Sequence, residues 1–479
     1  MDEKNFSEKE SADVTKKSAK GTKFYPKFHL AAPYGWINDP NGFCYFNGEY
    51  HMFYQYHPYS TEWGPMHWGH ATSKDLISWE DKPVALAPDK VYDKDGCFSG
   101  SAIEKDGKLY LMYTGHVNVG DHCEQTQCFA VSEDGVTFEK TPGNPVIGVP
   151  SLPEVFPFDY RDPKIWQHGK KYYCVIGSKT HDHIGQVALY ESVNMKNWKF
   201  KSIAVRDRTD ERTMWECPNL AELDGGDAMI ISVTIPQDGF NLYRTDYIAG
   251  KFDYAAGIFD DGYRTLIDFG TDFYAPQITT TPDGRVIMIG WLSMWGADMP
   301  EKNDGWAGMM SIPRELIFDA GKIRTVPAKE MKKLRGEGFT QKNISLGERT
   351  ELENFCGDVG ELLVKVDLKT NPVFALELRA DEDERTVLSF DAESNILRLD
   401  RENSGVGPKN PSEVRLKKSL KLDLQIFIDT SSIEIFANDG EAVISARIYP
   451  KETSQKIFFV PLKNSLEINS TTFYKLKCD

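Results

Sequence analysis

Turn dipeptides followed by strand patterns recur at a steady interval along the first two thirds of the chain. Each turn precedes a short run rich in aromatic and β-branched residues, a pattern typical of a strand. The turns are Asn47-Gly48, Asp106-Gly107, His168-Gly169, Gly225-Gly226 and Asp283-Gly284, and their starts are 59, 62, 57 and 58 residues apart. A fixed period of this length with hairpin turns predicts an all-β fold, a five-bladed β-propeller with four strands in each blade.

A second repeat runs in phase with the first and supports the same interpretation. It comprises residues 73–80, 132–139 and 192–199, and each copy pairs a Ser and an Asp or Asn with a later aromatic residue. We expect these segments to form the outer hairpin of each blade. A parallel α/β barrel would need a long amphipathic helix between strands, and the sequence shows no such pattern in this span.

The rest of the chain predicts a different organisation at each end. Residues 1–22 are rich in Lys, Glu and Ser and predict a disordered tail, so we place the propeller at 23–326. A Lys-rich segment, for which a short helix is one interpretation, opens a linker at 327–344. From 345 to 479 apolar and polar residues alternate with period two, which predicts a C-terminal β-sandwich.

Charge and composition restrict the kinds of ligand and the cellular location that we expect for this protein. The chain carries 56 Lys and Arg against 72 Asp and Glu, a net charge of −16, which disfavours nucleic acid and anionic membranes and suits a neutral ligand. The first twenty residues lack the apolar core of a signal peptide, and no spanning segment follows, so we expect a cytoplasmic protein. The eight scattered cysteines predict reduced thiols.

We expect no metal site. Cys123 and Cys128 lie near His116 and His122, but their spacing matches no recognised zinc motif, and we interpret all four as loop residues. Two further histidine pairs lack a third ligand in the pattern: His67 with His70, and His181 with His183.

A polar motif precedes each of the five turns. The motifs are Asn38-Asp39-Pro40, Phe98-Ser99-Gly100-Ser101, Arg161-Asp162-Pro163, Glu216-Cys217-Pro218 and Tyr274-Ala275-Pro276. The first strand of each propeller blade lines the central channel, so equivalent positions converge at one mouth of that channel although they are distant in sequence. The sequence therefore predicts that Asp39, Asp162 and Glu216 face one another.

Three converging carboxylates suit the cleavage of a glycosidic bond. That reaction needs a carboxylic acid that protonates the leaving oxygen and a second carboxylate that attacks the anomeric carbon or activates water. We expect the apolar neighbours Trp215 and Cys217 to favour the neutral acid form of Glu216. Donors in the following turn should keep Asp39 ionised. Arg161 should hold the adjacent Asp162 anionic, so that it can support positive charge on the sugar ring.

The chain resembles glycoside hydrolase family 32, the invertase or β-fructofuranosidase family, most closely its bacterial sucrose and sucrose-6-phosphate hydrolases. The resemblance runs from about Tyr25 to the C-terminus and rests on four motifs in order, 36–42 (WINDPNG), 98–101 (FSGS), 160–163 (YRDP) and 215–218 (WECP). Ile37 stands where the family often has Met. The resemblance implies a propeller followed by a sandwich and a retaining mechanism, with Asp39 as nucleophile, Asp162 as transition-state stabiliser and Glu216 as acid/base.

The resemblance also implies a pocket for a terminal fructosyl unit. Its expected lining is Asn38, Gln55, Trp63, Phe98, Ser99, Arg161, Tyr274 and Trp291. Trp63 and Trp291 would offer flat apolar faces to the sugar, and the polar members directed hydrogen bonds to its hydroxyls. For each aromatic residue, packing in the propeller core is the competing interpretation.

The prediction is a retaining β-fructofuranosidase that cleaves the terminal non-reducing β-D-fructosyl bond of sucrose or sucrose-6-phosphate without metal or cofactor. One alternative is a different propeller glycosidase, such as an inverting arabinan-cleaving enzyme with more widely separated carboxylates. Another is a sugar-binding propeller without turnover, which could dispense with acid and nucleophile.

Overall fold

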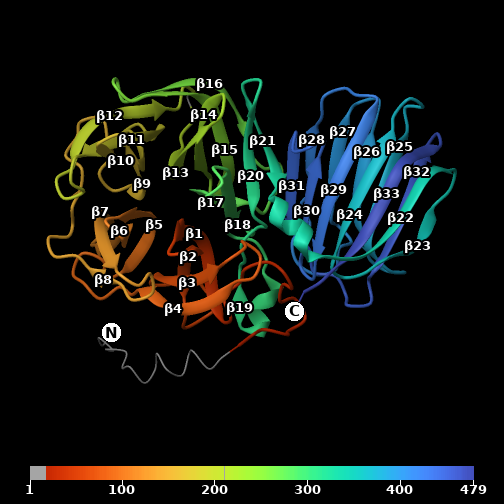
Figure 1. The fold of residues 1–479 in the computed structure, drawn as a ribbon, viewed down its shortest axis with the longest axis horizontal. Coiled ribbons are helices and arrows are strands. Elements are labelled where there is room, and N and C mark those ends of the chain that lie inside the picture. Colours follow the sequence, from red (N-terminus) through yellow and green to blue (C-terminus); the bar gives the residue numbers. More distant parts are fainter. Residues whose placement is uncertain (1–17, 210, 479) are drawn as a thin grey trace.

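The chain folds into a ring of five antiparallel sheets beside a two-sheet sandwich (Figure 1). The computed structural model describes residues 18–209 and 211–478. Blade I contains β1 (Gly35–Phe46), β2 (Glu49–His57), β3 (His67–Ser73) and β4 (Glu80–Leu86); blade II contains β5 (Gly96–Lys105), β6 (Lys108–Val119), β7 (His122–Ser132) and β8 (Glu139–Lys140). Blade III contains β9 (Tyr160–His168), β10 (Lys171–Lys179), β11 (Gly185–Ser192) and β12 (Lys199–Arg206).

The last two blades follow the same order. Blade IV contains β13 (Met214–Leu223), β14 (Gly226–Gln237), β15 (Phe240–Asp253) and β16 (Ile258–Leu266), and blade V contains β17 (Tyr274–Thr280), β18 (Val286–Trp291), β20 (Arg314–Asp319) and β21 (Lys322–Pro327). The predicted five-bladed propeller is therefore confirmed. Its innermost strands, β1, β5, β9, β13 and β17, pack against their neighbours around the ring.

Both sequence repeats correspond to hairpins. The five turn dipeptides join the first and second strands of the five blades, and Asn47 and Gly48 both have positive φ (50° and 87°), as a tight hairpin turn requires. The second repeat joins the third and fourth strands of blades I to III. In those turns the side chains of Asp75, Asp134 and Asn194 each accept two backbone N–H bonds, which explains the recurring Asp or Asn.

An insertion in blade V closes the ring. Between β18 and β20 the chain forms the 3₁₀ helix η1 (Pro300–Asp304) and the short strand β19 (Trp306–Ala307). β19 pairs in parallel with β1, with Gly35 opposite Trp306 and Trp36 opposite Ala307. Blade V is thus tied by backbone hydrogen bonds to the strand that carries Asp39.

The C-terminal part is the predicted β-sandwich. One sheet has the order β22 (Arg335–Leu346), β33 (Leu466–Leu476), β24 (Gly360–Asp367), β29 (Lys421–Asp429), β30 (Ser432–Ala437) and β31 (Ala442–Arg447). The other has β23 (Thr350–Cys356), β32 (Lys456–Lys463), β25 (Val373–Ala380), β26 (Thr386–Asp391), β27 (Ile396–Asp400) and β28 (Ser412–Arg415). Inward-facing aliphatic and aromatic side chains from both sheets form one continuous core, as period-two strands require.

The boundaries of the linker and tail differ from those expected. After the 3₁₀ helix η2 (Lys329–Leu334), β22 begins at Arg335 and pairs with β33, so most of the expected linker 327–344 is a sandwich strand. Its mostly polar sequence, with glycines at 336 and 338, concealed the period. Most of the expected tail 1–22 lies outside the described residues, but Ala19 is buried and its N–H bonds Pro33, so contact with the propeller begins before residue 23.

A network of buried charges joins the two domains. His29, ahead of β1, bonds two sandwich carboxylates, through Nδ1 to Asp429 at 2.7 Å and through Nε2 to Glu434 at 2.8 Å. Arg314 of blade V bonds the same Glu434 and also Asp268 at 2.7 Å. All three carboxylates and both basic side chains are almost completely inaccessible to solvent. We call these five residues the interface network.

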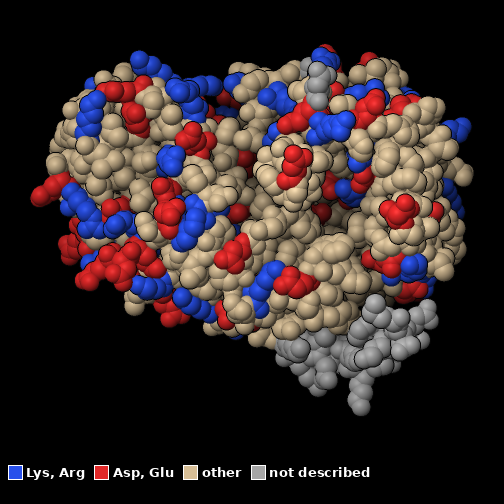
Figure 2. All heavy atoms as spheres, turned by 180° about the vertical axis from the view of Figure 1, so that it is seen from behind, with Lys and Arg blue, Asp and Glu red and all other residues tan. Residues whose placement is uncertain are grey.

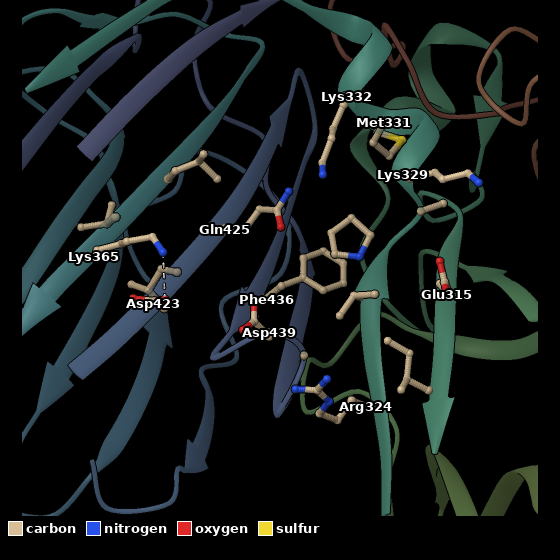
Figure 3. Close-up of a pocket in the computed structure, with 18 of the residues that line it drawn as sticks. Glu315, Arg324, Lys329, Met331, Lys332, Lys365, Asp423, Gln425, Phe436 and Asp439 are labelled. Atoms are coloured by element: carbon tan, nitrogen blue, oxygen red, sulfur yellow. Dashed lines mark hydrogen bonds and ion pairs between the residues drawn. The ribbon is translucent and has the colours of Figure 1, made fainter. Parts of the chain in front are cut away.

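An open groove of about 610 Å³ follows the outer side of the same interface (Figure 3). Glu315 of blade V and Gln425 of the sandwich line it from opposite sides. Most of its charged side chains already have partners; Lys365, for example, pairs with Asp423 at 3.2 Å. The groove is separate from the converging motifs, because it lies at the outer strands β20 and β21.

Acidic and basic side chains intermingle over the face shown in Figure 2. Within the part of the chain that the structure describes, no helix is long and apolar enough to cross a membrane. The cytoplasmic location expected from the sequence stays a prediction. All eight cysteines are free, as their scattered spacing predicted.

Candidate active site

A β-bulge interrupts each inner strand at its polar motif. The register with the second strand shifts between Ile37 and Pro40, Phe98 and Gly100, Arg161 and Lys164, Glu216 and Asn219, and Tyr274 and Gln277. A proline, which cannot donate to the ladder, occupies four of the five bulges, and Asp162 and Cys217 adopt positive φ (65° and 46°). The bulges re-aim the motif side chains, which explains why the same positions converge in different blades.

The bulge residues themselves form an inner ring around the channel mouth. Asp39 Oδ2 accepts a hydrogen bond from Ser99 Oγ at 2.6 Å, and its Oδ1 accepts one from Asn38 Nδ2 at 3.0 Å. The Cys217 thiol lies between two carboxylates, with Sγ 3.5 Å from Asp39 Oδ2 and 3.6 Å from Asp162 Oδ2. The backbone N–H of Cys217 also bonds Asp162 Oδ2 at 3.0 Å. Side chains from blades I to IV therefore meet at one point.

Glu216 directly precedes Cys217 in the chain, and its carboxylate has polar surroundings. Its Oε1 accepts hydrogen bonds from Arg161 Nη2 at 2.6 Å and Nε at 3.1 Å. Its Oε2 accepts one from Thr234 Oγ1 at 2.8 Å and a short one from the Tyr274 hydroxyl. The expectation of an apolar setting was wrong: Trp215 is fully buried in the blade core, and polar side chains of blades III, IV and V surround the carboxylate.

Arg161 is shared between two carboxylates, neither of which is its neighbour Asp162. Its Nη1 donates to Asp159 Oδ1 at 2.9 Å and to Gln125 Oε1 at 3.3 Å, while Nε and Nη2 hold Glu216. Asp159 Oδ2 in turn pairs with Lys179 Nζ at 2.5 Å. These contacts form a chain of alternating charge from the rim of the site to Glu216.

Burial dominates the electrostatics of the two aspartates. The pKa of Asp162 is raised to about 7, first by burial and then by the charges of Glu216 and Asp39, which together outweigh Arg161. The expectation that Arg161 holds Asp162 fully anionic was therefore wrong, because the guanidinium bonds elsewhere. Burial also raises the pKa of Asp39. The donors that partly offset the shift are Asn38 and, from blade II, Ser99, and not residues of the following turn as expected.

The three carboxylates open into one cavity of about 450 Å³. Six of the eight expected substrate-binding residues line it, namely Asn38, Gln55, Trp63, Phe98, Ser99 and Arg161. Trp63 is about half exposed (47%) and meets Phe98 edge to face at 6.0 Å between ring centroids, so it stands as a wall of the cavity. Gln55 is buried, and its amide donates to Cys97 O at 3.0 Å.

The two remaining predicted residues lie behind the cavity wall. Tyr274 is buried and reaches the site through its hydroxyl contact with Glu216. Trp291 is fully buried and packs against Trp36 at 5.8 Å and Trp295 at 5.1 Å. Trp295, four residues later, lines the cavity in its place. For Trp291 the structure thus shows core packing at the back of the site.

Sequence reasoning missed seven residues of the lining, His116, Gln125, Asp159, Thr234, Asn241, Tyr243 and Trp295. Several lie where the second and third strands of a blade end at the same mouth; Thr234, for example, pairs across the sheet with Met214 beside the blade IV motif. None of the seven pairs directly with a motif residue, and Asp159 and Trp295 lie outside the strands, so the motifs alone gave no signal for them. None of the four residues expected in loops lies in one. His116 is on β6 and stacks on Phe98 at 4.0 Å, and His122, Cys123 and Cys128 are on β7.

No cluster of three His, Cys, Asp or Glu side chains among residues 18–209 and 211–478 is placed to hold a metal ion. The chemistry available in the cavity is that of carboxylates, one guanidinium, hydroxyls and amides. Such a set can bind a polyhydroxylated ligand and can move protons to and from it.

Comparisons with known proteins agree with this geometry. The glycosyl hydrolases family 32 N-terminal domain matches residues 29–327, and the family's C-terminal domain matches 330–475. A sucrose-6-phosphate hydrolase of Escherichia coli is 39% identical over 456 residues, which cover 91% of this chain and 92% of the relative.

Solved structures are also similar to this chain over nearly its whole length. A variant of the Bombyx mori GH32 β-fructofuranosidase in complex with sucrose is similar with a TM-score of 0.84 and 32% identity, covering 98% of this chain and 97% of that one. A sucrose-6-phosphate hydrolase from Lactobacillus gasseri reaches a TM-score of 0.88 at 27% identity, with 100% and 98% coverage. From its two matched domains and its extended similarity to these enzymes, the chain belongs to glycosyl hydrolase family 32.

Proposed function

We propose that this protein is a retaining β-fructofuranosidase that hydrolyses the terminal non-reducing β-D-fructosyl bond of sucrose or sucrose-6-phosphate. The observation that supports it most is the meeting of Asp39, Asp162 and Glu216, from blades I, III and IV, in one cavity of about 450 Å³. This volume suits a ligand of the size of a mono- or disaccharide. Family membership and the sucrose-bound relative support the substrate class.

In the first step Asp39 attacks the anomeric carbon of the fructosyl unit. Asn38 and Ser99, which bond its two oxygens, orient the carboxylate for this attack. The bond between the anomeric carbon and the bridging oxygen breaks, and Glu216 gives its proton to that oxygen as the glucosyl group leaves. A covalent fructosyl ester of Asp39 and the anion of Glu216 result.

In the second step water completes the hydrolysis. Glu216 removes a proton from a water molecule, whose oxygen attacks the anomeric carbon and releases Asp39, so that fructose departs and both side chains return to their starting states. Asp162 lies close to Asp39 through the shared Cys217 contact. As an anion it stabilises the positive charge that develops on the sugar ring in both transition states.

The configuration of the first fructose released tests the mechanism. Two displacements at the anomeric carbon retain configuration, so ¹H NMR during sucrose hydrolysis should show β-D-fructofuranose before mutarotation. Release of the α anomer first would establish a single displacement and remove Asp39 as the nucleophile. Binding of sucrose without any reducing sugar would support the non-catalytic alternative.

A further inference from the structure

The ion pair between Arg161 and Glu216 conflicts with the role of Glu216 as a proton donor. A carboxylate that is held by two N–H groups of one guanidinium is stabilised as an anion, and an anion cannot donate a proton. Glu216 accepts such a pair at 2.6 and 3.1 Å, yet the proposed function requires its neutral form in the first step. Another group must therefore limit how strongly Arg161 stabilises the Glu216 anion.

Asp159 is placed to do so. It lies one residue ahead of β9 in the wall of the cavity and accepts a hydrogen bond from Nη1 of Arg161, the nitrogen that does not bond Glu216. Its negative charge neutralises part of the guanidinium charge on the far side from Glu216. Because the site is partly enclosed, this charge acts over a few ångströms with little screening.

Lys179 opposes the effect of Asp159 on Arg161. Its ammonium group, at the end of β10, pairs with the second oxygen of Asp159 at 2.5 Å and is mostly buried. Arg161 and Lys179 together lower the pKa of Asp159 despite its burial, so this carboxylate is charged throughout the neutral range. The order Lys179, Asp159, Arg161, Glu216 is thus a chain of four alternating charges.

We propose that Asp159 and Lys179 are positioning residues that set the pH range over which Glu216 can act as the acid, through their opposed effects on Arg161. The inference rests on the proposed function and concerns residues outside the four family motifs that identified the site. Removing the charge of Asp159 should strengthen the hold of Arg161 on the Glu216 anion. Removing the charge of Lys179 should have the opposite effect, because Asp159 then draws more strongly on Arg161.

Other titratable groups face this chain and stay constant in the comparison. Around Glu216 these are Asp39, Asp162, Cys217, Tyr243 and Tyr274. Around Asp159 they are Cys123 and His183, in addition to Arg161 and Lys179.

The test is the pH dependence of kcat/KM for sucrose, which reports the free enzyme described by these contacts. In Asp159→Asn the alkaline limb should move to lower pH by about one unit, and in Lys179→Met it should move to higher pH. Asp159→Glu, which restores the charge, should return the limb toward its wild-type position. Glu191→Gln is the matched control, because Glu191 pairs with Lys171 at 3.1 Å at the opposite end of β10.

Three outcomes would overturn the inference. An unmoved alkaline limb in Asp159→Asn would show that the chain does not act on Glu216. Limbs that move in the same direction in both variants, or activity lost equally at every pH, would show a merely structural role. A wild-type protein inactive on every β-fructoside would instead overturn the proposed function, and this inference with it, so the two failures are distinguishable.

Discussion

The interface network and the active site both bury several carboxylates, but they treat those charges in opposite ways. At the interface the pKa of Asp429 and that of Glu434 are lowered, because His29 and Arg314 outweigh the cost of burial. In the active site the pKa of Asp39 and that of Asp162 are raised, because burial and the charges of neighbouring carboxylates outweigh the hydrogen-bond donors and the guanidinium of Arg161. Paired charges fix the two domains together, whereas unpaired charges stay available for chemistry at the expense of stability.

The largest expected effect is on turnover, in the active site alone. Asp39→Asn should lower sucrose hydrolysis by about 10³-fold or more, since it removes the proposed nucleophile. The same change removes one of the three carboxylates that lie close together in the cavity, so the free energy of unfolding should stay the same or rise. Asp81→Asn on β4 of the same blade is the control. Near wild-type hydrolysis by Asp39→Asn would end the proposed mechanism.

The reverse pattern is expected for the interface network. Glu434→Gln leaves His29 and Arg314 buried with one fewer counter-charge, so it should lower the free energy of unfolding by about 3–5 kcal/mol. Urea unfolding measures this loss, and kcat at a temperature where the variant is folded should be unchanged. Glu393→Gln, in the exposed pair with Lys463, should cost less than about 1 kcal/mol. Equal losses in both variants would contradict the role given to the network.

The network should also make stability depend on pH. Asp429 and Glu434 raise the pKa of His29 to about 9, above the ordinary value of 6.5, although burial opposes them. This stabilisation is therefore fully present below about pH 6.5 and is lost as the pH rises to 9, a change of about 3 kcal/mol. Unfolding free energies between pH 6 and 9.5 measure it. The slope should disappear in His29→Gln, and a slope that survives in this variant would assign it to other groups.

The active site should respond to acid while the fold does not. Asp39 and Asp162 act as anions. Asp162, with its pKa raised to about 7, gains a proton as the pH falls below that value, and the raised pKa of Asp39 means that it is protonated at a higher pH than an ordinary carboxylate. The acidic limb of kcat/KM should therefore lie between about pH 5 and 7, well above that of an ordinary carboxylate. Circular dichroism should show a folded protein over the same range, because the lowered interface values protect the domain contact. Full activity at pH 4.5 would contradict these shifts.

The smallest expected effects concern two tryptophans, one in the wall of the cavity and one in the core. Trp63 is a half-exposed wall of the cavity, so Trp63→Ala should raise KM by about tenfold and leave the free energy of unfolding nearly unchanged. Trp291 is fully buried, so Trp291→Leu should instead lower that free energy by about 2–4 kcal/mol. Steady-state kinetics and urea unfolding of both variants separate the roles. A KM effect confined to Trp291→Leu would reverse the assignment.

Local pattern was enough to predict much of this architecture. The hairpin turns and the motifs ahead of them recur with the period of a blade, so five blades and the meeting of Asp39, Asp162 and Glu216 could be predicted without coordinates. What failed depended on contacts between blades. Arg161 precedes Asp162 in the chain, but its guanidinium reaches Asp159 and Glu216, because consecutive side chains on a strand point in different directions. Trp291 and Trp295 likewise exchange roles through packing that no local pattern encodes.

The parallel bridge between β19 and β1 has a consequence for how this ring could be cut or rearranged. Closure comes from an internal loop of blade V, so it does not require either chain end to stay where it is. A circular permutant that begins at another turn between blades should still close, whereas proteolytic cleavage between β18 and β20 would weaken only the backbone connection between the fifth and first blades, since β1 also packs against β5 and β17. Because the bridge ends at Trp36, three residues before Asp39, such a nick should disturb the position of the nucleophile before it unfolds any sheet.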